Sequence, residues 1–205
     1  QRIEREAKIP ADVVQGLEDL GALGMKIPEE YGGLGLGQVP YNRALAMAGT
    51  WHSSISTLLS AHQSIGLPEP LRLFGSEEQK REWLPKLAEN HVSAFLLTEP
   101  DVGSDPARMS TTAIPTEDGT GYRISGTKLW ATNGAIADVV VVMAVVPKSD
   151  GHRGGITAFI CPCDREGITV EHRNEFMGLR GIENSVTRFE DVFVPTADGI
   201  GGEGR

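Results

Sequence analysis

The chain has 205 residues, 40% of them hydrophobic, and a formal net charge of −9 at neutral pH. That length and apolar content suffice for one large domain or two small ones. The acidic balance and the lack of a clustered Lys/Arg surface argue against a nucleic-acid partner. No apolar run approaches the roughly 20 residues of a membrane-spanning helix, so we expect no transmembrane segment.

The first part of the chain, residues 1–91, shows the period of α-helices. Residues 1–6 are charged and look like the interior of a helix, and an apolar helical repeat follows them. A longer apolar stripe runs from Ala44 to Ile65 and includes Trp51 and His62. This stripe predicts a buried helical hairpin or one long bent helix.

After residue 91 the period drops to two, which is typical of strands. Turn-forming residues separate the runs with no helix-length crossover, so we expect an antiparallel barrel or sandwich. The expected architecture is therefore α+β, with an all-α domain over residues 1–91 and a small β domain over 92–196. Residues 197–205 are rich in glycine, are expected to pack no core, and are interpreted as a linker cut short. The predicted strands cover residues 110–114, 122–130, 139–146, 156–161, 168–172 and 185–194.

Two motifs in the β half contain residues suited to binding a ligand. Leu97 to Asp105 follows an apolar run and indicates a strand end that opens into a turn. Trp130 to Gly134 ends another predicted strand in a large aromatic ring, a hydroxyl and an Asn-Gly turn. An isoalloxazine ring needs a flat apolar wall, hydrogen-bond partners for its polar edge and N5, and donors for the attached pyrophosphate. The two strand ends offer these groups, which predicts a flavin site.

The order of these features resembles the acyl-CoA dehydrogenase family, and the resemblance covers essentially the whole chain. It implies a helical domain, then a β domain, and then a C-terminal helical domain that is not among these 205 residues. Leu59 to Gly66 is similar to the segment of long- and very-long-chain members, which favours a long acyl chain. The other matching segments are Ile27 to Gly33, Phe74 to Lys80, Thr98 to Pro100, Trp130 to Gly134, Met177 to Gly181 and Phe189 to Pro195.

The resemblance implies a set of FAD-binding residues. In the family, the residue matching Thr98 hydrogen-bonds the pyrimidine edge of the flavin, and the residue matching Trp130 covers one side of the ring. The match of Thr132 hydrogen-bonds N5, the atom that accepts hydride. The match of Ser104 lies near the FAD pyrophosphate and the pantetheine of coenzyme A, so Ser104 is also expected to bind substrate. The expected cofactor-binding residues are Phe95, Leu97, Thr98, Gly103, Ser104, Trp130, Ala131 and Thr132.

The implied reaction is α,β-dehydrogenation of a saturated acyl-CoA to the trans-2-enoyl-CoA, a step of fatty acid β-oxidation. Electrons would pass to an electron-transferring flavoprotein. The family's carboxylate base belongs to its C-terminal domain, so no catalytic residue is expected in this chain, and no metal ligand either. Glu99 is the nearest carboxylate in the motif and is interpreted as a structural hydrogen-bond partner.

Two alternatives remain open at this point. One is an acyl-CoA oxidase or a related flavin monooxygenase, in which oxygen takes the electrons. The other is a non-catalytic module that binds flavin or acyl-CoA. The resemblance also implies a homodimer or homotetramer, located in the cytoplasm of a bacterium or in the mitochondrial matrix of a eukaryote.

Three further residues have structural interpretations. His62 continues an apolar stripe, so we expect a core histidine whose hydrogen bonds are satisfied. Cys161 and Cys163 are too few for a disulfide framework and lack the partners that zinc usually takes. We expect buried or semi-buried thiols in a reducing compartment.

Overall fold

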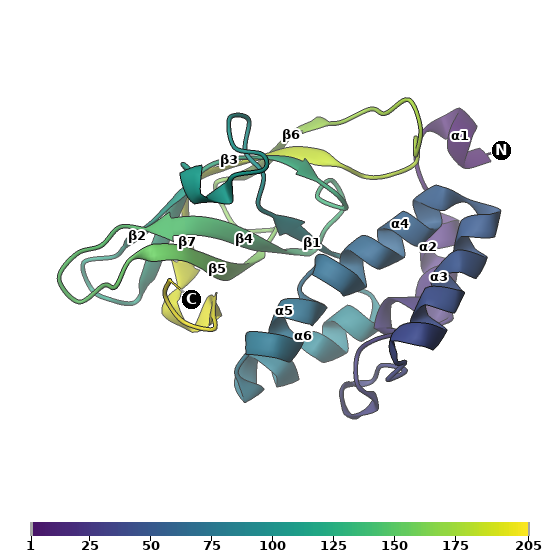
Figure 1. The fold of residues 1–205 in the computed structure, drawn as a ribbon, viewed down its shortest axis with the longest axis horizontal. Coiled ribbons are helices and arrows are strands. Elements are labelled where there is room, and N and C mark those ends of the chain that lie inside the picture. The colour runs from purple at the N-terminus through teal and green to yellow at the C-terminus, as the bar shows by residue number, and fades with distance from the viewer. Residues whose placement is uncertain (1, 205) are drawn as a thin grey trace.

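The computed structural model describes residues 2–204. Gln1 and Arg205, the outermost residues of the expected helical domain and linker, lie outside the described part. Within it, helices and a sheet form two neighbouring halves (Figure 1). The α-helices are α1 (Arg2–Glu6), α2 (Ala11–Asp19), α3 (Gln38–Trp51), α4 (Ser53–Ser60), α5 (Pro68–Phe74) and α6 (Glu77–Glu89). The strands are β1 (Ser93–Leu96), β2 (Thr112–Pro115), β3 (Gly121–Ala131), β4 (Val139–Val146), β5 (Gly155–Pro162), β6 (Ile168–Arg173), β7 (Ser185–Pro195) and β8 (Gly199–Ile200).

The sheet is mixed, which corrects the expectation of purely antiparallel strands. Its order is β6-β7-β3-β2-β4-β5-β8, with β1 beside β4. β1 pairs with β4 in parallel over four residue pairs, and β2 meets β4 in parallel at one pair. The chain from β1 to β4 passes through β2 and β3, so a β-hairpin makes the long return that a helix usually makes in a parallel pair.

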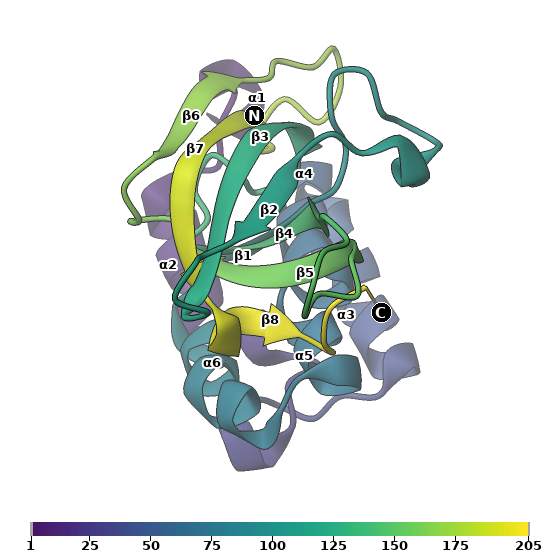
Figure 2. The ribbon, with the colours of Figure 1, turned by 90° about the vertical axis from the view of Figure 1, so that its left-hand side faces the viewer.

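The central strand β4 explains how the two halves hold together. Its residues alternate between the two faces, and both faces are buried: Val140 and Val142 lie in the core of the sheet, whereas Val139 and Val141 pack against α5 and α6. A strand covered on both sides is apolar throughout, as its sequence is. Helices α5 and α6 therefore lie against one face of the sheet, and Figure 2 shows them behind and below the strands.

The stripe from Ala44 to Ile65 forms two helices rather than one. His52 is extended, with φ −164°, and its Nδ1 accepts a hydrogen bond from the Ser54 N–H, so it ends α3 and caps α4. This break turns Trp51 out of the predicted buried stripe, and its side chain is 83% exposed. After α4 a π-helical turn, Ala61–Ile65, continues the chain. Turns of this type are often found at functional sites.

The glycine-rich end of the chain packs more than expected. Gly199–Ile200 forms β8 on the edge of β5, and Ile200 is 4% exposed in the core under α5 and α6. Gln79 of α6 donates to the carbonyls of Ala197 and Gly199 at 2.8 and 2.9 Å. The prediction that residues 197–205 pack no core is therefore wrong. Among residues 2–204, no helix is both long and apolar enough to cross a membrane.

Candidate functional site

The two motifs predicted to carry chemistry lie together. Thr98 follows the end of β1, and its carbonyl accepts a hydrogen bond from the Leu129 N–H of β3 at 2.8 Å. The loop after β1 is thereby fixed beside the last residues of β3. Two segments about thirty residues apart in sequence thus form one site.

Trp130 leaves the regular strand, and this exposes its ring. The pairing of β3 with β7 shifts register between Lys128 and Ala131, and Trp130 has a left-handed φ of +59°. A bulky residue in this conformation costs on the order of 1–2 kcal/mol and is held by its surroundings. The side chain is 53% exposed although both neighbours along the strand are at least partly buried.

The turn after Trp130 is anchored to the helical half. Asn133 also has a positive φ, +68°, and its side-chain amide donates to the Leu58 carbonyl of α4 at 3.0 Å. Gly134 follows, and a Cβ there would lie 2.3 Å from the Ser185 hydroxyl, so only glycine fits against β7. These contacts explain the Asn-Gly pair in the sequence.

A cavity of about 790 Å³ opens between α5, the end of β1 and the end of β3. Four of the sequence-predicted residues line it: Phe95, Leu97, Thr98 and Trp130. Sequence reasoning did not predict the other residues that line the cavity. The signal that could have found them is the set of apolar residues exposed on a helix. These further lining residues are Ser64, Ile65, Glu69, Pro70, Leu73, Phe74, Leu129, Met143, Ala158, Ile200 and Gly201.

A second pocket of about 510 Å³ adjoins the first along α4. Thr132 lines this pocket, and Ser64 and Ile65 of the π-helical turn line both. Its remaining wall consists of Leu45, Ala46, Ser56, Thr57, Ser60 and Ala61, most of them small. Thr132 therefore stands where a pocket lined by α3 and α4 meets the cavity under Trp130.

Three predicted cofactor residues do not line either space. Ala131 is 1% exposed and belongs to the core of the sheet. Gly103 and Ser104 are exposed on the loop after β1. A Cβ added at Gly103 would meet nothing within 4 Å, so packing inside the chain does not require glycine there. Their roles toward a cofactor remain predictions.

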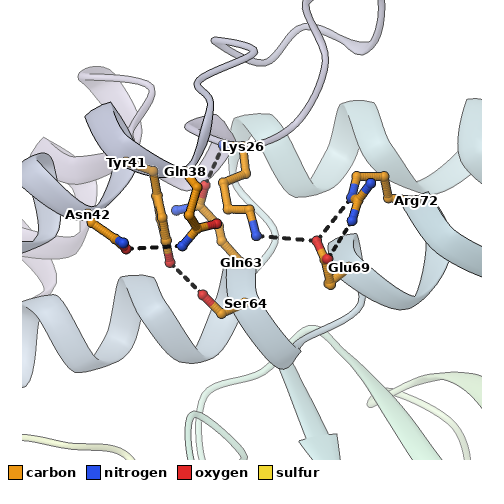
Figure 3. Close-up of polar contacts among 8 residues, drawn as sticks. All are labelled: Lys26, Gln38, Tyr41, Asn42, Gln63, Ser64, Glu69 and Arg72. Carbon is orange, nitrogen blue, oxygen red and sulfur yellow. Dashed lines mark hydrogen bonds and ion pairs between the residues drawn. The ribbon is translucent and has the colours of Figure 1, made fainter.

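A cluster of polar contacts between the helices includes Ser64 and Glu69, two residues that line the cavity (Figure 3). Glu69 of α5 receives hydrogen bonds from Arg72 at 2.7 Å and from Lys26 at 3.3 Å. The Arg72 hydrogen bond lowers the pKa of Glu69 more than partial burial raises it, and Lys26 lowers it further. The lowered pKa makes Glu69 a weak base, and both of its carboxylate oxygens already accept hydrogen bonds, which does not suit a general base. Beside it, the Tyr41 and Ser64 hydroxyls lie 2.8 Å apart.

Glu99 is a structural hydrogen-bond partner, as the sequence indicated. Its buried carboxylate accepts from Ser110 N–H at 2.7 Å, Thr111 N–H at 2.9 Å and the Lys128 ammonium at 2.9 Å. Burial raises the pKa of Glu99, but hydrogen bonds from Ser110, Thr111 and Lys128 outweigh it and hold the pKa at about 2. Sequence reasoning missed Lys128, a buried lysine in a strand where polar and apolar residues alternate.

His62, Cys161 and Cys163 have the structural roles expected of them. His62 is fully buried; its Nδ1 accepts from the Ser93 N–H at 3.0 Å, and its Nε2 donates to the Leu87 carbonyl at 3.1 Å. Burial lowers the pKa of His62 to about 4 and raises the pKa of each thiol to about 12, so all three are neutral at pH 7. The described residues contain no group of three side chains suited to a metal ion.

The chemistry of the lining fits the ring of a flavin. Phe95, Leu97 and Trp130 offer apolar walls, and the Thr98 and Thr132 hydroxyls can donate and accept at a polar edge. Gly103 and Ser104, exposed on the adjoining loop, leave a backbone N–H and a hydroxyl open to phosphate oxygens.

Comparison with known proteins finds matches for both the helical half and the β half of the chain. Residues 1–91 match the model of the acyl-CoA dehydrogenase N-terminal domain, and residues 94–192 match that of the acyl-CoA dehydrogenase middle domain. Over 202 residues, 98% of this chain and 31% of the relative, the sequence is 63% identical to a probable acyl-CoA dehydrogenase, FadE10, of Mycobacterium tuberculosis.

Two further relatives extend the comparison. Over 192 residues, 91% of this chain and 29% of the relative, the sequence is 40% identical to the human mitochondrial very long-chain specific acyl-CoA dehydrogenase. The crystal structure of an acyl-CoA dehydrogenase complexed with FAD from Bacillus anthracis aligns with a TM-score of 0.86 and 34% identity, over 98% of this chain and 33% of the other. The chain spans about a third of the length of these relatives.

Proposed function

Because this chain belongs to the acyl-CoA dehydrogenase family, a family of FAD-dependent oxidoreductases, we propose that it forms the flavin-binding half of such an enzyme. The proposed reaction is α,β-dehydrogenation of a saturated acyl-CoA to the trans-2-enoyl-CoA in fatty acid β-oxidation. One observation carries the proposal: Trp130 and Thr98 line one cavity, and Thr132 lines the pocket that adjoins it.

Bound FAD would supply the acceptor for the hydride that leaves the substrate. The chain's own residues would hold the ring in place. Phe95, Leu97 and Trp130 would cover its faces, Thr98 would hydrogen-bond its polar edge, and Thr132 would contact it at N5. The strain at Trp130 and the anchored turn after it support this assignment, because preorganised sites hold side chains at fixed positions.

The loop after β1 is proposed to bind the charged parts of both ligands. Gly103 would let its backbone approach the FAD pyrophosphate, and the Ser104 hydroxyl would reach that group and the pantetheine of coenzyme A. The exposure of Gly103 and Ser104 supports the assignment, since their polar groups are free to meet a ligand.

The pocket along α4 is proposed to take the acyl chain, and a long one. Its wall consists largely of small residues, among them Ala46, Ser60 and Ala61, which leave room between α3 and α4. Thr132 and residues of α4 line the same pocket, so a chain entering beside the flavin would run along α4. The similarity of Leu59 to Gly66 to long-chain members supports the same substrate class.

No residue among 2–204 is proposed as the base that removes the α-proton. Glu69 lines the cavity and Glu99 follows Thr98 in the adjoining loop, and the partners of both lower their pKa, which makes each a weak base. We propose that the base comes from a part of the protein beyond the two matched domains. We also propose a homodimer or homotetramer, and a bacterial cytoplasmic or mitochondrial location that follows the source.

The test is anaerobic flavin absorbance of the full-length protein mixed with saturated acyl-CoAs from short to very long chain. The proposal predicts bleaching, greatest with long chains, that persists in oxygen until an electron-transferring flavoprotein is added. Rapid reoxidation by oxygen with peroxide release would instead establish an oxidase or monooxygenase. No bleaching, or no bound flavin, would leave a non-catalytic module.

A further inference from the structure

The Thr132 hydroxyl has a partner that the motif around it does not contain. The side-chain amide of Asn184 donates a hydrogen bond to the Thr132 hydroxyl oxygen, with 3.2 Å between nitrogen and oxygen. Asn184 directly precedes β7, the strand that pairs with β3, and is 3% exposed. A buried amide therefore meets Thr132 on the side of the sheet, whereas the pocket adjoins Thr132 on the helical side.

The orientation of this amide is fixed by a second asparagine. The Asn174 side-chain amide donates to the Asn184 side-chain oxygen at 2.7 Å, and the Asn174 backbone N–H donates to the Asn184 carbonyl at 2.8 Å. Asn174 is itself 7% exposed. Because the Asn184 side-chain oxygen is occupied by Asn174, its NH₂ group is the end that faces Thr132.

A hydroxyl has one proton to donate and two lone pairs that accept. Asn184 occupies one lone pair of the Thr132 oxygen, and a proton cannot point at a group that is itself donating. The Thr132 proton and its second lone pair are thus directed away from Asn184. Other hydroxyls of the same pocket differ: Ser56 and Thr57 donate to the Ser53 carbonyl of their own helix.

We infer that Asn184 is a positioning residue that orients the Thr132 hydroxyl toward the bound flavin, and that Asn174 holds Asn184 in place. The inference rests on the proposed function, because it takes the flavin to lie beside Thr132. A hydroxyl kept free to donate and accept can interact with a ring nitrogen both before and after that nitrogen gains a hydrogen. The amide pair thereby prepares the site for both oxidation states of the cofactor.

The test compares Asn184→Leu and Asn184→Asp with Thr132→Val in the full-length protein carrying FAD. Asn184→Leu removes the donor without adding charge. Asn184→Asp keeps an acceptor for Asn174 but replaces the donor with a second acceptor, which draws the Thr132 proton away from the flavin. Each variant is also combined with Thr132→Val. Two readouts are the rate of anaerobic flavin reduction by acyl-CoA and the flavin midpoint potential, which requires no substrate.

Both Asn184 variants are expected to slow flavin reduction about tenfold, the effect of one lost hydrogen bond of ordinary strength. Both are expected to shift the midpoint potential in the direction that Thr132→Val does. In the Thr132→Val background Asn184→Leu, which adds no charge, should change neither readout. Asn174→Ala, which leaves Asn184 in place but releases its amide, should produce a smaller shift of the same sign. Asn42→Leu on the exposed side of α3 is the matched control and should change nothing.

Equal effects of Asn184→Leu with and without the Thr132 hydroxyl would overturn the inference, because Asn184 would then act independently of Thr132. So would a potential unchanged by both Asn184→Leu and Asn174→Ala. A parent protein whose flavin is not bleached by acyl-CoA contradicts the proposed function, while coupling between Asn184 and Thr132 in the midpoint potential would still support the inference. A parent that binds no FAD overturns both.

Discussion

The Lys128 ammonium lies 2.9 Å from the Glu99 carboxylate, and the two side chains are 0% and 2% exposed. Lys128 belongs to β3 and precedes Trp130, whereas Glu99 follows Thr98 in the loop after β1. The ion pair therefore ties together the two strand ends that line the cavity. Burial lowers the pKa of Lys128, whereas the hydrogen bond to Glu99 and the charge of Glu99 raise it. The buried ammonium therefore depends on Glu99 to compensate its charge.

Replacing Lys128 with methionine should destabilise the protein strongly. The substitution leaves the Glu99 carboxylate buried without its cation, which costs about 3–5 kcal/mol in free energy of unfolding. Adding Glu99→Gln should recover part of this loss, since no buried charge then remains. Lys80→Met is the control, because Lys80 pairs with Glu77 on the exposed surface of α6 and should cost less than about 1 kcal/mol. Urea denaturation measures all four proteins; equal losses for Lys128→Met and Lys80→Met would contradict the prediction.

The buried His62 should make stability depend on pH. Its pKa is lowered from 6.5 to about 4 in the folded protein, so the unfolded chain binds a proton there that the folded protein does not. Stability from this group is complete above pH 6.5 and is lost as pH falls from 6.5 to about 4. The loss amounts to about 3 kcal/mol for a shift of this size.

His62→Gln should flatten that dependence, whatever it costs in stability at pH 7. The measurement is the free energy of unfolding in urea at several pH values between 4 and 7. His91→Gln serves as the control, because the imidazole of His91 lies outside the buried core. If His62→Gln keeps the parent slope over this interval, His62 is not the group responsible.

Filling the pocket along α4 should shorten the preferred substrate. Ser60 lines the pocket, and Ser60→Leu would occupy space between α3 and α4. We expect kcat/KM for long acyl-CoAs to fall about tenfold or more, with short acyl-CoAs affected about threefold at most, as a narrowed apolar pocket discriminates by size. Ser53→Leu at the exposed start of α4 is the matched control. Uniform loss across chain lengths would show that the acyl chain does not enter this pocket.

Trp130→Ala should impair the flavin more than the substrate. The ring is 53% exposed at the cavity, so its loss removes little packing within the chain itself. We expect slower flavin reduction and reoxidation in stopped-flow measurements, with a smaller change in the acyl-CoA dissociation constant. Trp51→Ala provides the comparison, because Trp51 is 83% exposed and lines neither cavity. A change confined to the substrate dissociation constant would argue against the assignment of Trp130.

The sequence predicted the elements well where one period dominates. The alternation in β3 and β7 and the continuous apolar run of β4 gave strands close to those observed, within about two residues at each end. It did not predict that β1 joins β4 in parallel, because strand pairing depends on the path of the chain through β2 and β3. It also misjudged Ile200, since a two-residue strand shows no period and Ile200 is buried through its packing against other elements of the fold.

The site residues that could be predicted from the sequence are those that belong to short motifs. Thr98, Trp130 and Thr132 stand in segments that match family motifs, and the structure brings them together at two adjoining spaces. Lys128 and Asn184 belong to no such motif. Each is a buried polar residue whose partner lies far away in sequence, so its role becomes visible only when the fold places the two side chains together.

We propose that the flavin ring lies between Phe95, Thr98 and Trp130, with the acyl chain along α4. The most direct test is an experimental structure of the full-length protein with FAD and a long-chain acyl-CoA analogue bound. We predict the ring in the cavity under Trp130, the Thr132 hydroxyl within hydrogen-bond distance of N5, and the acyl chain in the pocket beside Ser60. A flavin bound elsewhere, or an acyl chain that leaves the α4 pocket empty, would contradict this account.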